Sequence, residues 1–227
     1  MTAGSPGPAP TYDTILFDID GTLCDPGKSI IECARYALAT FGIQETDETK
    51  LRRFVGPPLE HAFRDYYGFD VAQTARAVAY FRGMMRREGI QLYTAYPGIR
   101  ELLGELKQSG RQLAIVTSKI DCIARESLAK TGLIGFFEFI SAQQPDIVVN
   151  KRDILVKALS ELHITNNSGI VMIGDRRHDI EAANANNIDS IGVLWGYGDS
   201  DELHNEGATH IVADTNELKQ LLLNCKD

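Results

Sequence analysis

The stretch that decides the fold of this chain is Ile15-Leu16-Phe17-Asp18-Ile19-Asp20-Gly21-Thr22. It begins as an apolar run, which is typical of a buried strand when a turn signal such as glycine follows. Asp18 and Asp20 end the run, and two carboxylates are costly to bury unless they bind a metal or take part in chemistry. Residues two apart on a strand point to the same side. We therefore expect both acids to face one pocket at the carboxyl end of a parallel strand, where ligands of open α/β sheets bind.

A second apolar run, Leu113 to Val116, ends in Thr117, Ser118 and Lys119. Taken alone, it fits a strand followed by a helix that a hydroxyl caps, because Ser and Thr are favoured at the N-cap. It also fits a phosphate site, since hydroxyl groups and the backbone N–H groups at a helix start bind anions. The two interpretations are compatible.

Two further segments place charged residues beside predicted elements. Lys151 precedes an amphipathic helix, where a lone lysine is more often a solvated surface charge. Asp175 follows Gly174 at the end of an apolar run over residues 170–173, and Asp179 lies four residues further on. Acidic side chains favour a helix N-terminus, which would account for Asp179 but not for Asp175.

These four segments, in this order, resemble the motifs of the haloacid dehalogenase-like hydrolases, and the resemblance extends from Asp18 to Asp179. It implies an α/β fold: a Rossmann-like, doubly wound parallel sheet with an inserted α-helical cap. The alternation of predicted strands and helices after residue 97 favours the same sheet. Residues 191–198 and 207–212 are similar to the phosphoglycolate-phosphatase-like branch, which includes 5′-nucleotidases.

The resemblance implies a phosphatase that works through an aspartyl-phosphate. Asp18 would be the nucleophile, and Asp20 would protonate the leaving alcohol and then deprotonate the attacking water. Thr117 and Lys151 would hold the transferring phosphoryl group. Ser118 would be a further substrate contact.

The resemblance also implies a magnesium site built from four aspartates. Mg²⁺ prefers carboxylates, carbonyls, water and substrate phosphate as ligands. Asp18 and Asp175 would supply side-chain oxygens, and Asp20 would supply its backbone carbonyl. Asp179 would bind the metal directly or support its water shell.

Composition and spacing divide the chain into a tail, a core and a cap. Residues 1–10 are rich in Gly, Pro, Ala and Ser, which predicts a disordered tail. The core is expected to comprise 11–24 and 93–227, and to begin with a strand over residues 12–18. Residues 25–92 have helical spacing and no clear strand, so they predict the helical cap.

The cap contains a loop that is expected to meet the substrate. In capped relatives, the segment that corresponds to Gly56, Pro57 and Pro58 faces the active site and reads the leaving group. The same residues also fit a turn between helices, with a proline in the first turn of the second helix. Phe63, Tyr66 and Tyr67 follow the loop, and they could stack on a base, although such aromatic residues more often pack in a core.

Composition narrows the partners of the chain. A length of 227 residues suits one core with a modest insert, and a net charge of −8 disfavours nucleic acid polymers and anionic membranes. No apolar stretch is long enough to span a membrane, and no apolar signal core begins the chain, which predicts a cytoplasmic protein. The four cysteines form no metal or redox motif and predict reduced thiols. The expected partner is a small phosphorylated metabolite, and the chain would be a monomer or a homodimer.

Three functions are compatible with these observations. The first is an Mg²⁺-dependent phosphomonoesterase, similar to 5′-nucleotidases or phosphoglycolate phosphatases. The second is a sugar phosphomutase of the same fold, but such mutases carry a cap-loop arginine and an early histidine that residues 56–60 and 24–28 lack. The third is a non-catalytic phosphate-binding scaffold protein, which would be expected to have lost acids such as Asp18, Asp20 or Asp175.

Overall fold

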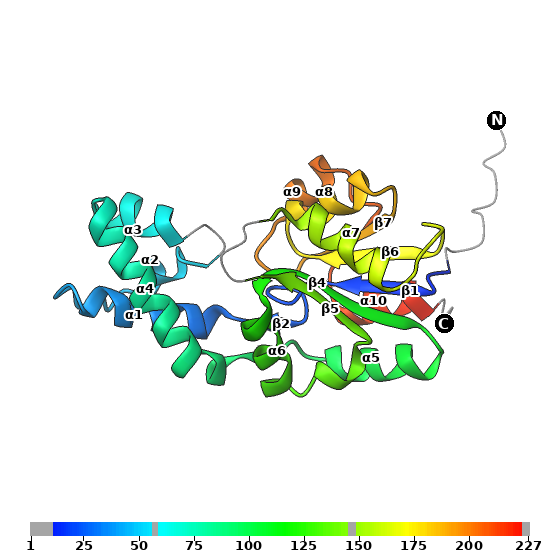
Figure 1. Ribbon diagram of the computed structural model, residues 1–227, viewed down its shortest axis with the longest axis horizontal. Helices are drawn as coiled ribbons and strands as arrows, with labels where there is room; N and C mark the ends of the chain where they lie inside the picture. The colour runs from blue at the N-terminus through cyan, green and yellow to red at the C-terminus, as the bar shows by residue number, and fades with distance from the viewer. Residues whose placement is uncertain (1–10, 56–58, 145–148, 224–227) are drawn as a thin grey trace.

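The core of the protein is a six-stranded parallel sheet. The structure is a computed structural model that describes residues 11–55, 59–144 and 149–223, and its sheet has the strand order β5-β4-β1-β6-β7-β8 (Figure 1). The strands are β1 (Thr14–Phe17), β4 (Gln112–Ile120), β5 (Phe139–Gln143), β6 (Ile170–Gly174), β7 (Asp189–Val193) and β8 (His210–Val212). The chain winds outward from β1 first in one direction and then in the other. The carboxyl end of β1 is therefore the switch point at which such sheets bind ligands.

Helices cover both faces of the sheet, as the predicted doubly wound α/β fold requires (Figure 1). One face carries α5 (Ile99–Gln108), α6 (Asp121–Lys130) and α10 (Thr215–Leu223), and the other carries α7 (Lys151–Glu161) and α8 (Arg177–Ala185). Two shorter helices of the core are α9 (Ser200–Asn205) and the 3₁₀ turn η2 (Ile134–Phe136).

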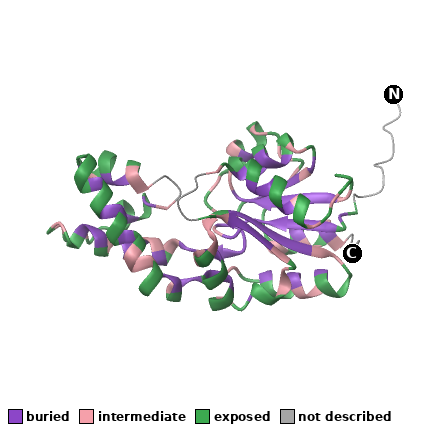
Figure 2. Ribbon diagram, in the orientation of Figure 1, coloured by how far each residue is buried: buried purple, intermediate pink, exposed green. Residues whose placement is uncertain are grey.

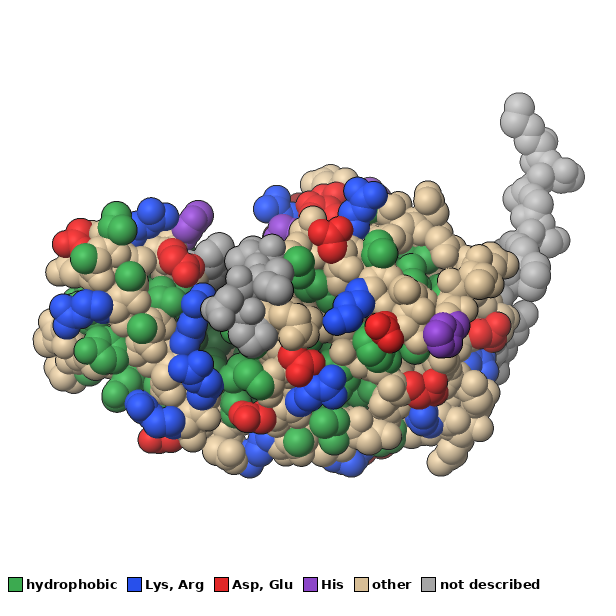
Figure 3. Space-filling model, viewed as in Figure 1, with side chains coloured by type: hydrophobic (Ala, Val, Ile, Leu, Met, Phe, Trp, Pro, Cys, Tyr) green, Lys and Arg blue, Asp and Glu red, His purple; other side chains and the backbone are tan. Residues whose placement is uncertain are grey.

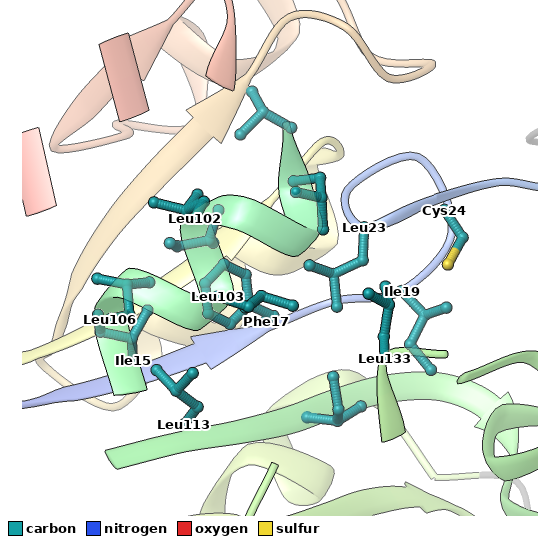
Figure 4. Packing of buried hydrophobic residues seen from close by; sticks show 14 of the residues in the cluster. Ile15, Phe17, Ile19, Leu23, Cys24, Leu102, Leu103, Leu106, Leu113 and Leu133 are labelled. Carbon is teal, nitrogen blue, oxygen red and sulfur yellow. The ribbon is translucent and has the colours of Figure 1, made fainter. Parts of the chain in front are cut away.

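Strand β1 joins the two layers because its alternate side chains point to opposite faces. Ile15 and Phe17 pack with the leucines of α5, as Figure 4 shows, whereas Leu16 packs in the cluster under α7 and α8. Each of these side chains is fully buried. Burial on both faces explains why the strand reads as a continuous apolar run.

A strand was expected over residues 12–18, but β1 is shorter and spans only Thr14–Phe17. The chain then turns tightly: the carbonyl oxygen of Ile19 accepts hydrogen bonds from the backbone N–H groups of Leu23 and Cys24, both at 2.9 Å. Asp18 and Asp20 therefore lie beyond the strand, and strand alternation does not set the directions of their side chains.

A helical region with its own apolar cluster lies beside the sheet (Figure 2). Its elements are α1 (Gly27–Ala39), α2 (Glu48–Arg52), α3 (Leu59–Tyr67), α4 (Val71–Arg87) and the 3₁₀ turn η1 (Gly89–Leu92). Buried residues of this cluster come from α1 to α4 and include Leu38, Leu51, Phe63 and Phe81. Because the cluster is separate from the two that flank the sheet, we infer that these helices form the cap.

The cap joins the core at two short strands, β2 (Cys24–Asp25) and β3 (Thr94–Ala95), which pair antiparallel. We call this pair the cap connection. We propose that the cap, residues 25–92, begins and ends at this pair. The surface is hollowed between the cap and the core at the upper edge of Figure 3.

Other predictions concern the membrane, the thiols and the tail. No helix within the described ranges is both long and apolar enough to cross a membrane. Cys24, Cys33 and Cys122 are free cysteines. Cys225 and the predicted tail over residues 1–10 lie outside the described residues.

Candidate active site

Three buried aspartates meet at the carboxyl edge of the sheet. Asp18 directly follows β1, Asp175 directly follows β6, and Asp179 lies in the first turn of α8. Because β1 and β6 are neighbouring parallel strands, their carboxyl ends bring these residues together. One oxygen from each of the three carboxylates lies within 4.8 Å of the others. We call this group the acid cluster.

Lys151 joins two members of the acid cluster. Its Nζ lies 2.8 Å from Asp18 Oδ1 and 2.5 Å from Asp179 Oδ1. It begins α7, whose first turn is capped by the Asn150 side chain, and only 9% of its surface is exposed. Burial lowers the pKa of Lys151, but the two carboxylates outweigh burial and leave the pKa raised, so the ammonium stays charged. The neighbouring Arg152 is exposed and lies outside the cluster.

Within the described ranges, no cation forms an ion pair of this kind with Asp175. Its Oδ2 accepts a hydrogen bond from the backbone N–H of Tyr197 at 2.8 Å, while its Oδ1 is buried with no hydrogen-bond partner among the described residues. Burial, together with the charges of Asp179 and Asp18, raises the pKa of Asp175 to about 8. Among the residues that the structure describes, three buried carboxylates thus face one lysine, and an oxygen set with this imbalance fits a divalent cation such as Mg²⁺.

Glycines leave the space that the acid cluster occupies. A Cβ on Gly21 would lie 2.0 Å from Asp175 Oδ2, and one on Gly174 would lie 2.0 Å from Asp179 Cγ. Gly21 also has a φ of +83°, a conformation that side chains other than glycine rarely adopt. The glycine that follows Asp20 in the sequence is therefore required both by the turn and by the close approach of Asp175.

The segment Thr117-Ser118-Lys119, which carries the two predicted hydroxyls, lies at a bulge in β4. The pairing with β5 shifts between Thr117 and Ile120, so the two intervening residues leave the regular ladder. Thr117 is buried, whereas Ser118 is exposed. The strand continues to Ile120, and α6 begins without a side-chain cap. The expectation that a hydroxyl of this segment caps the next helix is therefore wrong.

Asp20 is held by Lys119, a residue for which the sequence analysis predicts no role. Lys119 Nζ lies 2.6 Å from Asp20 Oδ2 and 2.6 Å from the hydroxyl oxygen of Tyr93. Burial raises the pKa of Asp20, and the ion pair with Lys119 opposes this effect. A cation after the hydroxyls was visible in the sequence, but its contacts come from segments far away in the chain.

The cap residues predicted to bind substrate, Gly56, Pro57 and Pro58, lie outside the described residues. The aromatic residues after the loop differ in their surroundings. Phe63 is fully buried in the core of the cap, where it packs edge-on against another phenylalanine at 4.9 Å between ring centroids. Tyr66 is 45% exposed. Of these two rings, Tyr66 is the one that a ligand could reach.

Comparisons with known proteins agree with this geometry. Residues 15–193 match the family described as haloacid dehalogenase-like hydrolase. A 5′-nucleotidase from Pseudomonas aeruginosa is 37% identical over 211 residues, which cover 93% of this chain and 96% of that protein. The tyrosine-protein kinase PtkA of Mycobacterium tuberculosis is 33% identical over 224 residues, which cover 97% of this chain and 75% of that protein. The crystal structure of a Clostridium difficile protein assigned as a phosphatase superposes with a TM-score of 0.90 at 35% identity, covering 93% of this chain and 99% of that one.

Proposed function

This chain belongs to the haloacid dehalogenase-like hydrolase family and is a phosphatase of that family, and on this premise we propose that it hydrolyses phosphate monoesters of small metabolites through an aspartyl-phosphate on Asp18. The observation that carries the proposal is the acid cluster. Asp18 lies buried against the Lys151 ammonium at 2.8 Å, beside a carboxylate oxygen of Asp175 that has no hydrogen-bond partner within the described part of the chain.

The residues divide the reaction into two displacements. An Asp18 oxygen attacks phosphorus while the ester bond breaks, and water then attacks the aspartyl-phosphate. Such covalent catalysis replaces one difficult step with two easier ones. Lys151 offers a fixed positive charge to the transferring group, and the buried Thr117 hydroxyl offers a hydrogen-bond donor. Asp20 exchanges the proton with the leaving oxygen and with water.

The acid cluster would hold the metal. We propose Asp18, Asp175 and the Asp20 carbonyl as ligands of Mg²⁺, which supplies positive charge to the phosphoryl oxygens when bound. Both carboxylate oxygens of Asp179 already have partners, because Oδ1 pairs with Lys151 and Oδ2 accepts the backbone N–H of Arg176 at 3.1 Å. We therefore favour support of the lysine and of the metal's water shell as the role of Asp179.

The substrate we favour is a nucleoside monophosphate. The 37% identity with a 5′-nucleotidase along nearly the whole chain supports this choice. Tyr66 on the cap is 45% exposed, with the Arg53 guanidinium 5.5 Å from the centroid of its ring, and its exposed part offers a surface on which a base could stack. Gly56, Pro57 and Pro58, which precede Tyr66 in the sequence, would contact the leaving group. Phosphoglycolate is the second candidate.

The test is phosphate release from a panel of nucleoside monophosphates, phosphoglycolate, sugar phosphates and pyrophosphate, with Mg²⁺ and with chelator. We expect Mg²⁺-dependent release with a preference for one class, and loss of turnover in D18N. The matched control is D65N, which makes the same change at an exposed position on α3. Steady-state hydrolysis by D18N would refute the nucleophile. No release by folded wild-type protein with Mg²⁺ would shift support to the mutase or scaffold hypotheses, which a sugar-phosphate isomerisation assay separates.

A further inference from the structure

We propose that Lys119 is a positioning residue for Asp20, and that Tyr93 at the cap connection holds Lys119 in place. The inference rests on the proposed function, because it assigns how the proton-transfer residue of that reaction is oriented. Its basis is a chain of two contacts: Lys119 Nζ to Asp20 Oδ2 at 2.6 Å, and Lys119 Nζ to the Tyr93 hydroxyl at 2.6 Å.

The bulge in β4 explains how Lys119 reaches this position. A regular strand would continue its ladder past Thr117, but the register with β5 resumes only at Ile120. Bulges re-aim side chains, and they are common next to active sites. The Lys119 side chain is only 11% exposed, although it lies on a segment where its neighbour Ser118 faces solvent. Burying a lysine costs free energy unless the ammonium is paired, and here Asp20 Oδ2 and the Tyr93 hydroxyl oxygen pair with it at short range.

The contact distinguishes the two oxygens of Asp20. Oδ2 is bound by Lys119, whereas Oδ1 is buried and has no hydrogen-bond partner in the residues described. The hydrogen bond to Oδ2 is possible in both protonation states, because an ammonium can donate to a carboxylate oxygen and, more weakly, to the carbonyl oxygen of a carboxylic acid. We therefore assign the transferable proton to Oδ1.

The proton then follows a balanced path. In the first displacement, the bond between Asp18 and phosphorus forms, the ester bond breaks, and the proton on Asp20 Oδ1 passes to the leaving oxygen. In the second, the water oxygen bonds to phosphorus, the bond to Asp18 breaks, and one water proton returns to Oδ1. Lys119 keeps its protons throughout, so it orients the acid without taking part in the transfer.

Tyr93 ties this arrangement to the cap. It lies between η1 and β3, where the chain returns from the cap to the core, and it is 97% buried, with 3% of its surface exposed. The Lys119 ammonium lies 4.7 Å from the centroid of its ring, a cation–π distance, in addition to the contact with its hydroxyl. A change in the cap connection would therefore move the group that orients Asp20.

The experiment compares leaving groups. A general acid matters when the leaving oxygen is strongly basic, as in an alkyl phosphate, and matters little when it leaves as a stable anion, as in 4-nitrophenyl phosphate. We would measure kcat for both esters in wild type, K119M, K119R, Y93F, D20N and the double variant D20N/K119M. K107M is the matched control, because it removes a lysine from an ion pair with Glu138 before β5, at the opposite edge of the sheet.

Since general acid catalysis contributes roughly 10²–10⁴-fold, we expect K119M to lose about 10- to 100-fold on the alkyl ester and less than about threefold on the nitrophenyl ester. Y93F should show a smaller loss of the same pattern, and K119R should restore part of it. The double variant should lose no more than D20N alone, because both changes disable one function. K107M should match the wild type.

Two outcomes would overturn the inference. The first is an equal loss by K119M on both esters, with wild-type turnover intact, which would make Lys119 a general electrostatic or structural residue. The second is an additive loss in D20N/K119M. If K119M does not fold, the ester dependence of Y93F decides in its place. A wild type that releases phosphate from neither ester would instead refute the proposed function.

Discussion

Asp175→Asn should make the metal-free protein more stable while it abolishes the response to Mg²⁺. The Asp175 carboxylate lies buried beside Asp18 and Asp179, and its Oδ1 has no hydrogen-bond partner among the residues that the structure describes. Asparagine keeps the shape and can still accept the hydrogen bond from Tyr197, but it carries no charge. It also offers an amide donor to the neighbouring carboxylates.

The magnitude follows from the pKa of Asp175, which rises from its ordinary 3.8 to about 8 in the folded protein. Because the pKa of Asp175 is higher in the folded than in the unfolded protein, its ionised form destabilises the folded state. Its penalty is absent below about pH 4 and grows until about pH 8. At about 1.4 kcal/mol for each tenfold change in the protonation equilibrium, the penalty at pH 7 is on the order of 4 kcal/mol. Because neighbouring acids share this effect, we expect D175N to gain about 2–4 kcal/mol.

The assay is thermal unfolding with chelator and with Mg²⁺, between pH 5 and 8. For a chain of this size, about 2–4 kcal/mol corresponds to roughly 4–16 °C in Tm. In chelator, D175N should melt above the wild type at pH 7, and the difference should shrink toward pH 5. Mg²⁺ should raise the Tm of the wild type and leave that of D175N nearly unchanged. A metal-free D175N that melts below the wild type, or equal protection of both by Mg²⁺, would refute the reasoning.

Four further substitutions test other parts of the site. Lys151→Met should lower kcat by roughly 10²–10³-fold in a phosphate-release assay, the usual effect of removing a preorganised donor, and a loss below tenfold would contradict its role. Thr117→Val should lower kcat/KM at least about tenfold, with a Tm within a few degrees of wild type. Ser118→Ala, at an exposed position, should change kcat/KM by less than about threefold. A larger loss in Ser118→Ala than in Thr117→Val would reassign the phosphate contact to Ser118. Gly21→Ala should destabilise the protein by more than about 1 kcal/mol in urea unfolding and weaken Mg²⁺ binding, because its methyl group would overlap Asp175; wild-type stability would show that the turn adapts.

The sheet and the acid cluster follow largely from local sequence. The apolar runs before Asp18, Thr117 and Asp175 predict buried strands, and a parallel sheet brings their carboxyl ends together. The role of Lys151 is implied by the family resemblance and not by its local sequence, and the structure brings Lys151 to the acid cluster. Helix periodicity likewise predicts a helical cap.

Other features depend on contacts that no local pattern encodes. Strand alternation predicted that Asp18 and Asp20 share a face, but β1 ends before both, and the turn determines where they point. Lys119 acquires its contacts through a bulge in β4 and through Tyr93, which lies 26 residues away in the chain. Two-residue strands such as β2 are too short to leave a periodic signal, so the cap connection was not predicted as a strand pair.

The pairing of β2 with β3 has a consequence for how this protein could change during evolution. The chain leaves the core and returns to it at adjacent points, so the segment between them is a cassette with neighbouring ends. A different insert could be grafted there without altering the order of the six core strands, and the hydrolytic machinery would be inherited intact. Selectivity and chemistry can then diversify at different rates, because they are encoded in separate stretches of the gene.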